Sequence, residues 1–200
     1  CPSVGSHVVL KRTETQAQQG HLDQLKLATF NIYNRPWDRA QRLARTREVI
    51  LELDADVVAL QEVSEGLLVG DDAKEMLAGL PYPYQAYFML ERWGPFFENG
   101  LYVLSRWPFD DARGKVHEVN RLFNRKGLLV ASIAAPGTRL RIVTLHQPAT
   151  RRTSITMPQA ESVVSTLGEL GGDELLVVLG DFNAFVGDPP VARIIAGGGL

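Results

Sequence analysis

Four apolar segments of this chain each end in side chains that can bind a phosphate or a metal ion. Apolar runs of this length are typical of buried strands. Side-chain direction repeats every second residue along a strand, so Asp181 and Asn183 are predicted to point the same way. One polar residue at a strand end is ordinary, whereas four such ends predict a site. The segments are Leu25–Asn31, Val57–Glu62, Leu140–His146 and Leu175–Asn183.

The same segments, in the same order, resemble the endonuclease/exonuclease/phosphatase superfamily. The resemblance rests on Ala28–Ile32, Leu60–Val63, Asn99–Arg106, Thr144–His146 and Gly180–Asn183. It implies an α/β fold, a four-layered α/β sandwich of two mainly antiparallel sheets with flanking helices. It also implies hydrolysis of phosphoesters with Mg²⁺ or Mn²⁺. One such domain is expected over residues 25–200, which suits a chain of 200 residues that is 45% hydrophobic.

Five residues receive catalytic or metal-binding roles. Glu62 is the predicted metal ligand, because an anionic oxygen at a strand end suits Mg²⁺, and Asn31 adds an amide oxygen or positions a ligating water. The resemblance implies that Asp181 orients the attacking water, Asn183 contacts the scissile phosphate and His146 binds a phosphate oxygen. Taken singly, Asn31 is also compatible with a turn, Glu62 with a solvated loop and His146 with packing in a core.

Two further residues are predicted to bind the substrate. Asn99 matches a substrate-contacting position in some members of the superfamily, and Lys126-Gly127 resembles a pair in its sphingomyelinase-like branch. The alternative for each is a turn. His117, in a charged stretch, is expected at the surface.

The end of the sequence departs from the superfamily pattern. Its members continue to an Asp-His pair whose histidine is the general base, but here no histidine follows His146, and Asp188 is the only later aspartate after the Asp181 motif. The closing strands are therefore expected to be missing from this chain, which ends in the glycine-rich stretch Ile194–Leu200. The 200-residue form is accordingly expected to be inactive or nearly so. A catalytically silent binding module of the same fold is an alternative.

The predicted substrate is a lipid head group or a small phosphodiester. Asn99–Pro108, Lys126-Gly127 and Gln147 resemble the sphingomyelinase-like branch, and an aromatic loop at Glu91–Glu98 is suited either to a membrane surface or to packing on itself. A magnesium-dependent nuclease is the alternative, disfavoured because the net charge is −2 and no basic stripe is evident. The arginines at 35, 39, 42, 45 and 47 are interpreted as a solvated helix face, with a phosphate patch as the alternative.

The first 24 residues are predicted to be a polar tether. A terminal Cys1 is typical of a processed bacterial lipoprotein, which predicts an extracytoplasmic, lipid-anchored protein; without that role for Cys1 the protein is expected in the cytoplasm. No run of ~18 apolar residues predicts a membrane span. The sequence does not indicate an oligomeric state.

Periodicity and turn residues predict the remaining elements. The predicted helices cover Trp37–Leu53, Ala73–Leu80 and a segment that begins at Pro158. The predicted strands cover Tyr84–Met89, Gly100–Ser105, and a hairpin of Gly127–Ala134 with Arg139–Leu145.

Overall fold

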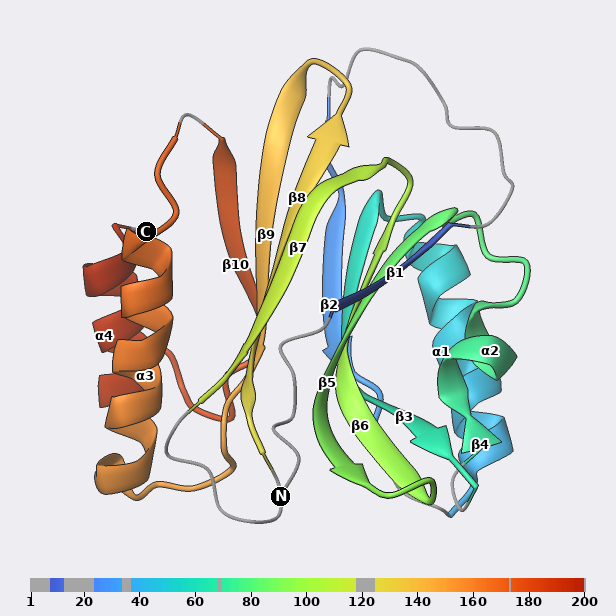
Figure 1. Ribbon diagram of the computed structural model, residues 1–200, viewed down its shortest axis with the longest axis horizontal. Coiled ribbons are helices and arrows are strands. Elements are labelled where there is room, and N and C mark those ends of the chain that lie inside the picture. Colours follow the sequence, from blue (N-terminus) through green and yellow to red (C-terminus); the bar gives the residue numbers. More distant parts are fainter. Residues whose placement is uncertain are drawn as a thin grey trace.

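The computed structural model describes residues 8–12, 24–33, 37–67, 70–117, 125–172 and 174–199, which form four layers (Figure 1). Two sheets face each other, and a pair of helices covers the outer face of each. The first sheet has the order β1 (Val8–Arg12), β5 (Tyr84–Trp93), β6 (Phe97–Ser105), β3 (Val57–Gly66) and β2 (Leu27–Asn31), with β4 (Gly70–Asp71) paired to β3. The second has the order β10 (Leu175–Asp181), β9 (Thr138–His146), β8 (Gly127–Ala135) and β7 (Phe109–Val116). The helices are α1 (Arg39–Leu53), α2 (Asp72–Leu77), α3 (Thr153–Gly168) and α4 (Pro189–Gly198).

Most neighbouring strands are antiparallel, but each sheet ends in one parallel pair among the described strands. β2 runs parallel to β3, and β10 runs parallel to β9. The carboxyl ends of parallel strands lie at the same edge, so each pair delivers two strand ends to one place. The predicted four-layered sandwich of mainly antiparallel sheets is confirmed.

Three apolar cores separate the four layers, and alternation along β3 shows how one strand serves two of them. Val57 and Ala59 pack between the two sheets, whereas Val58 and Leu60 pack against α1 and α2. Successive side chains of a strand point to opposite faces, so a continuous apolar run is what a strand buried on both sides requires. A third core lies between the second sheet and α3 and α4.

Several sequence predictions of element bounds need correction. The aromatic segment predicted as a loop over Glu91–Glu98 is mostly strand, because β5 continues to Trp93 and β6 begins at Phe97. α3 begins at Thr153, so Pro158 lies inside the helix and does not open it. The glycine-rich stretch largely belongs to α4, and β7 had no counterpart in the prediction.

The predicted tether is also partly wrong. Val8–Arg12 forms β1, which pairs with β5, and Val8 packs against the core between the sheets. Two β-branched valines and a leucine at this point supply what an edge strand needs. Cys1 and the other residues at 1–7 and 13–23 lie outside the described residues.

The arginine cluster on α1 is engaged by neighbouring groups. Arg39 lies 2.8 Å from carboxylate oxygens of Asp72 and Glu75, and Arg45 lies 2.8 Å from Glu48. An ion-paired helix face therefore describes these two arginines better than a phosphate patch, and residue 35 lies outside the described residues. Within the described segments, no helix is both long and apolar enough to cross a membrane.

Candidate active site

The two parallel strand pairs bring the predicted site residues to one end of the molecule. Asn31, the last residue of β2, lies opposite Gln61 of β3, and Asp181, the last residue of β10, lies opposite His146 of β9. In Figure 1 these strand ends lie at the lower end of the sandwich. One pair belongs to each sheet, so the site lies between the sheets and needs both.

Alternation within each strand points these side chains inward. In β9, Leu140 and Ile142 pack between the sheets, and His146 follows in the same phase. In β10, Val177 and Leu179 do the same, and Asp181 follows. The same period places Asn31 two residues after Thr29, on the inner face of β2.

Glu62 enters the site by a different route. Leu60 and Val63 both pack on the helix side of β3, so one extra residue is inserted between them, and the strand register shifts there. Glu62 has a φ of 62°, in the left-handed region that non-glycine residues seldom adopt. Such a bulge re-aims a side chain, and here it turns the Glu62 carboxylate toward the inner face.

Two carboxylates converge on one amide. The Nδ2 of Asn31 donates to Glu62 Oε1 at 3.0 Å and to Asp181 Oδ2 at 2.9 Å. The other carboxylate oxygen of Asp181 accepts the backbone N–H of Asn183 at 2.9 Å. Both oxygens of Asp181 are thus held in place, and two anionic oxygens from opposite sheets lie close together.

The side chains of His146 and Lys126 lie beside these two carboxylates. His146 Nε2 is 3.7 Å from Glu62 Oε1 and 3.6 Å from Asp181 Oδ2, and Lys126 Nζ is 2.8 Å from the same imidazole nitrogen. Burial, with a smaller effect of the Lys126 charge, lowers the pKa of His146 to about 4. Burial also lowers the pKa of Lys126, which Glu62, Asp181 and Glu91 oppose. A protonated lysine can only donate, so His146 is neutral and accepts from it.

Asn183 adopts a left-handed backbone conformation with a φ of 48° just past the end of β10. Its Nδ2 donates to the carbonyl oxygen of Gln147 at 2.9 Å, and the N–H of Gln147 donates to the Asp181 carbonyl at 2.8 Å. Asn183 is therefore fastened to the segment after β9 and does not join the two carboxylates, although it remains beside them in the chain.

His117 is buried, so its predicted place at the surface is wrong. It follows β7 directly, its N–H donates to the Lys126 carbonyl at 3.0 Å, and its Nε2 lies 3.1 Å from Gln147 Nε2. Burial lowers the pKa of His117 to about 4. The charged residues around His117 in the sequence concealed β7, whose pairing with β8 carries His117 inward.

Asn99 lies on β6 opposite Ser64 of β3 and Glu91 of β5. Its side-chain oxygen is buried without a hydrogen-bond partner among the described residues. Gln61 is a further residue of the site, and no sequence motif pointed to a role for it. This fully buried side chain donates from Nε2 to Thr29 Oγ1 at 3.0 Å and to Thr144 Oγ1 at 3.1 Å, which links the two sheets directly beneath the site.

The chemistry of the donor set fits a hard divalent cation. Glu62 and Asp181 offer converging carboxylate oxygens, and Mg²⁺ is commonly bound through one or two carboxylates while it keeps several waters. No cluster of three or more His, Cys, Asp or Glu ligands occurs in the described part of the chain. The Asn31 Oδ1 accepts the N–H of Tyr33 at 2.8 Å, so ligation by that oxygen requires the amide to turn over.

Comparisons with known proteins agree with this geometry. The model of the Endonuclease/Exonuclease/phosphatase family matches residues 28–200. The search of curated proteins found no match.

Three of the similar solved structures illustrate the fold. Sphingomyelinase C from Streptomyces griseocarneus is 21% identical, with a TM-score of 0.70 over 87% of this chain and 69% of that one. An endonuclease/exonuclease/phosphatase from Beutenbergia cavernae is 23% identical, with a TM-score of 0.70 over 87% of this chain and 52% of that one. A mutant beta toxin from Staphylococcus aureus with bound magnesium ions is 19% identical, with a TM-score of 0.70 over 87% of this chain and 70% of that one.

Proposed function

Because the chain belongs to the endonuclease/exonuclease/phosphatase family, we propose that it is a phosphodiesterase, dependent on Mg²⁺ or Mn²⁺, that acts on a lipid head group or a small phosphodiester. The observation that carries the proposal is the pair of carboxylates, Glu62 and Asp181, that converge on Asn31 opposite His146 and Lys126.

Each side chain has a role that its contacts support. Glu62 and Asp181, with the amide of Asn31, would hold the divalent ion, which when bound neutralises phosphate charge and polarises a phosphoryl oxygen. Asp181 also has the fixed orientation that is needed to accept a hydrogen bond from the attacking water. Hydrogen-bond donors that are held in place before the reaction stabilise developing charge effectively. Lys126, held beside His146, would be such a donor to a phosphate oxygen.

An exposed apolar surface at the turns that follow β3 and β5 supports a lipid substrate. The tips of two hairpins meet where the Leu67 N–H donates to the Pro95 carbonyl at 3.1 Å. Leu67 is 77% exposed, Trp93 51% and Phe96 52%. We define these three residues as the hairpin tip. Exposed aromatic and aliphatic side chains of this kind suit the boundary between lipid head groups and acyl chains.

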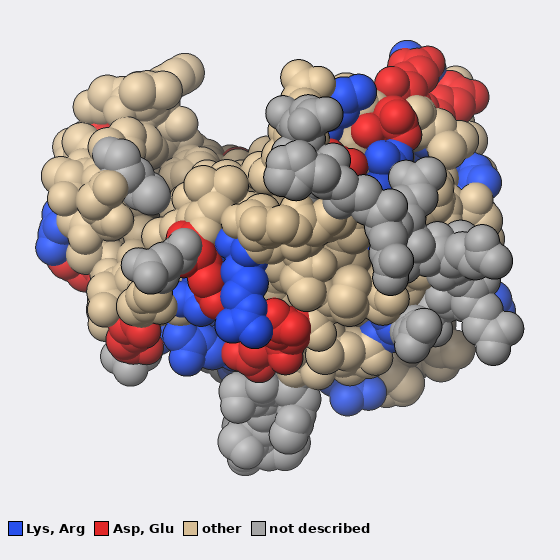
Figure 2. Space-filling view, turned by 90° about the horizontal axis from the view of Figure 1, so that it is seen from above, with Lys and Arg blue, Asp and Glu red and all other residues tan. Residues whose placement is uncertain are grey.

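The net charge favours a lipid or small molecule over nucleic acid. Figure 2 shows the end of the sandwich that faces away from the site, and there Lys and Arg are interspersed with Asp and Glu. Non-specific binding of nucleic acid draws mainly on phosphates neutralised by basic residues, and a net charge of −2 does little to supply it. The extracytoplasmic, lipid-anchored location remains a prediction, because Cys1 lies outside the described residues.

Hydrolysis of matched substrates tests the proposal. We expect the full-length protein to cleave vesicle lipids with choline- or glycerol-type phosphodiesters faster than it nicks plasmid DNA at the same Mg²⁺ and salt concentrations. Truncation of Trp93 and Phe96 to alanine should lower cleavage of vesicle lipid by ~10-fold or more and leave a soluble analogue nearly unaffected, because membrane contact adds buried apolar area. Leu175→Ala, an exposed apolar residue at the opposite end of β10, is the control.

Three outcomes would contradict the proposal. Rapid nicking of plasmid with untouched vesicle lipid would indicate a nuclease. Binding of a phosphodiester without hydrolysis at any Mg²⁺ or Mn²⁺ concentration would indicate a silent binding module. If the Trp93 and Phe96 variants lose activity on vesicle lipid and on the soluble analogue equally, the hairpin tip does not contact the membrane.

A further inference from the structure

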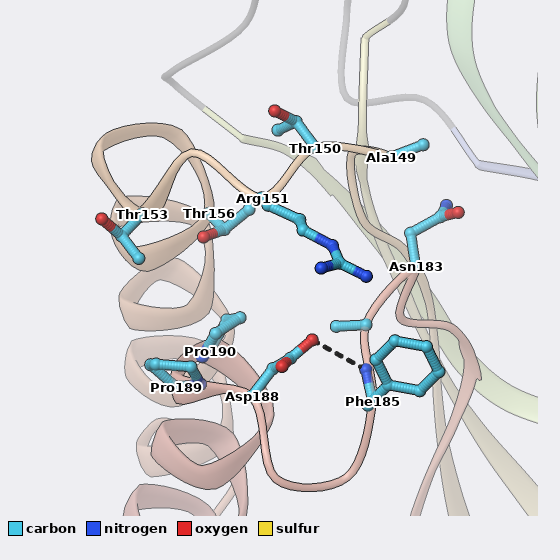
Figure 3. A pocket seen from close by; sticks show the side chains of 11 residues that line it. Ala149, Thr150, Arg151, Thr153, Thr156, Asn183, Phe185, Asp188, Pro189 and Pro190 are labelled. Atoms are coloured by element: carbon cyan, nitrogen blue, oxygen red, sulfur yellow. Dashed lines mark hydrogen bonds between the residues drawn. The ribbon is translucent and has the colours of Figure 1, made fainter.

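A cavity of about 490 Å³ lies beside Asn183 and extends away from the two carboxylates. Its walls come from three segments: residues 149–151 after β9, the first turns of α3 and α4, and the loop that follows β10. Figure 3 shows Arg151 and Asp188 directed into this space and Asn183 at its rim. A volume of this size is typical of small-molecule sites, and Asn183 is the lining residue that the cavity shares with the proposed catalytic site.

Arg151 is the basic side chain of this cavity. Its guanidinium carbon lies 5.9 Å from the centre of the Phe185 ring, in a cation–π arrangement. No carboxylate forms an ion pair with Arg151 in the described part of the chain. Stacking on a ring leaves the N–H groups at the edge of the guanidinium available, and that planar fork matches a phosphate or carboxylate.

Asp188 is the acidic residue among those that line the cavity. One carboxylate oxygen of Asp188 accepts the N–H of Phe185 at 2.9 Å, which holds the loop in its curved form. Thr150 and Thr153 also line the cavity, and the Thr150 hydroxyl accepts the Arg152 N–H at 3.3 Å. Arg151 lies over one face of the Phe185 ring, and the Phe185 side chain is 71% exposed.

We propose that this cavity binds a second anionic group of the substrate, a phosphate or a carboxylate, and that Arg151 is the residue that recognises it. The inference rests on the proposed function, because it takes Asn183 as the contact to the scissile phosphate. The preferred substrates are then phosphodiesters that carry a further anion on the side of the molecule that enters the cavity.

The subsite is tested by comparing the binding of two ligands that differ by one phosphate, a measurement that does not require hydrolysis. The probes are propanediol bisphosphate and propyl phosphate, measured by calorimetry under the same excess of Mg²⁺. Wild-type protein should bind the bisphosphate at least ~10-fold more tightly than the monophosphate, because a charge-assisted bidentate contact is added. Arg151→Ala should remove that preference, and Arg151→Lys should keep part of it.

Two further variants sharpen the test. Arg152→Ala removes the neighbouring exposed arginine, which does not line the cavity, and should leave the preference unchanged. Asp188→Asn keeps an oxygen for the Phe185 N–H but removes a negative charge, so the bisphosphate should bind about 3-fold more tightly. A preference that survives Arg151→Ala, or one that Arg152→Ala abolishes, overturns the proposal.

The source of the anion is distinguished with vesicles of phosphatidylcholine, with and without a phosphatidylinositol phosphate. If the protein sediments with the phosphorylated lipid and Arg151→Ala abolishes this binding, the cavity is assigned to a lipid head group. If Arg151→Ala weakens binding of the soluble bisphosphate alone, the cavity is assigned to a small molecule. Hydrolysis of bis(nitrophenyl) phosphate separates the two inferences. If the protein hydrolyses this substrate but Arg151→Ala keeps the preference for the bisphosphate, only the subsite is refuted. If Arg151→Ala loses that preference but the wild-type protein hydrolyses nothing, only the enzymatic function is refuted.

Discussion

Glu62 owes its place in the site to one unusual backbone angle. A regular β3 would point Glu62 toward α1, and the left-handed conformation with its inserted residue points it inward. Conformations of this kind cost on the order of 1–3 kcal/mol and persist where the surrounding structure enforces them. Both faces of β3 are packed here, which provides that enforcement.

Glu62→Gln tests the charge and leaves the shape of the side chain in place. We expect hydrolysis at saturating Mg²⁺ to fall by at least ~100-fold, because an anionic ligand is lost from the ion. Steady-state kinetics over a Mg²⁺ series provides the measurement. Glu65→Gln, an exposed carboxylate on the same strand, is the matched control and should retain activity. Full turnover of the Glu62 variant, or of wild-type protein in excess chelator, would refute the role.

His117 predicts a specific dependence of stability on pH. Its pKa is lowered to about 4 by burial, against an ordinary value of 6.5. The folded state therefore binds fewer protons than the unfolded state between these values, so the stabilising contribution is present above pH 6.5 and is lost as pH falls toward 4. Measured by urea unfolding, the free energy of unfolding of the wild-type protein should fall by ~2 kcal/mol more than that of His117→Gln between pH 7.5 and pH 5. Parallel losses in the two proteins would mean that His117 titrates normally.

At the scale of elements, the close contact of β10 with β9 depends on Gly180. Its φ is 139°, and a Cβ there would meet the Leu145 carbonyl oxygen at 2.2 Å. Gly172 has a similar φ of 122° but open space around it. Gly180→Ala should lower the free energy of unfolding by more than ~3 kcal/mol, and Gly172→Ala by only about 1 kcal/mol, since it lacks the clash. Denaturant titration of both variants isolates the steric cost, and equal losses would show that backbone strain alone matters.

The elements that the sequence predicted best are the strands whose side chains alternate regularly between the two faces of a sheet. The strands that end at Asn31, His146 and Asp181 were predicted, and regular alternation alone places these side chains between the sheets. Glu62 was assigned as an anionic residue at a strand end, but the bulge that turns it inward could not be predicted, because a bulge leaves no mark in hydrophobic periodicity. β7 was missed because its exposed charges mask a strand that is apolar on one side only, and β1 because five residues in a polar stretch gain their strand character from β5.

The whole molecule has a site that is divided between its two sheets. Glu62 belongs to the first sheet and Asp181 to the second, so a divalent ion held by both would stabilise the native packing of one sheet on the other. At ~100 times its dissociation constant, Mg²⁺ should raise the melting temperature by roughly 5–10 °C. Calorimetry in Mg²⁺ and in a Na⁺ salt of matched ionic strength measures this shift. Glu62→Gln should lose the shift and Glu65→Gln should keep it; an equal rise in both would exclude Glu62 as a ligand.

The Asn31–Asp181 hydrogen bond joins residues 150 positions apart in the chain. Contacts of such long range form late, because their entropy of loop closure is compensated only once the intervening elements have packed. During synthesis, the proposed centre can therefore assemble only after the ribosome has released the chain as far as β10. A nascent chain without β10 lacks Asp181, one of the two carboxylates on which the proposed hydrolysis depends.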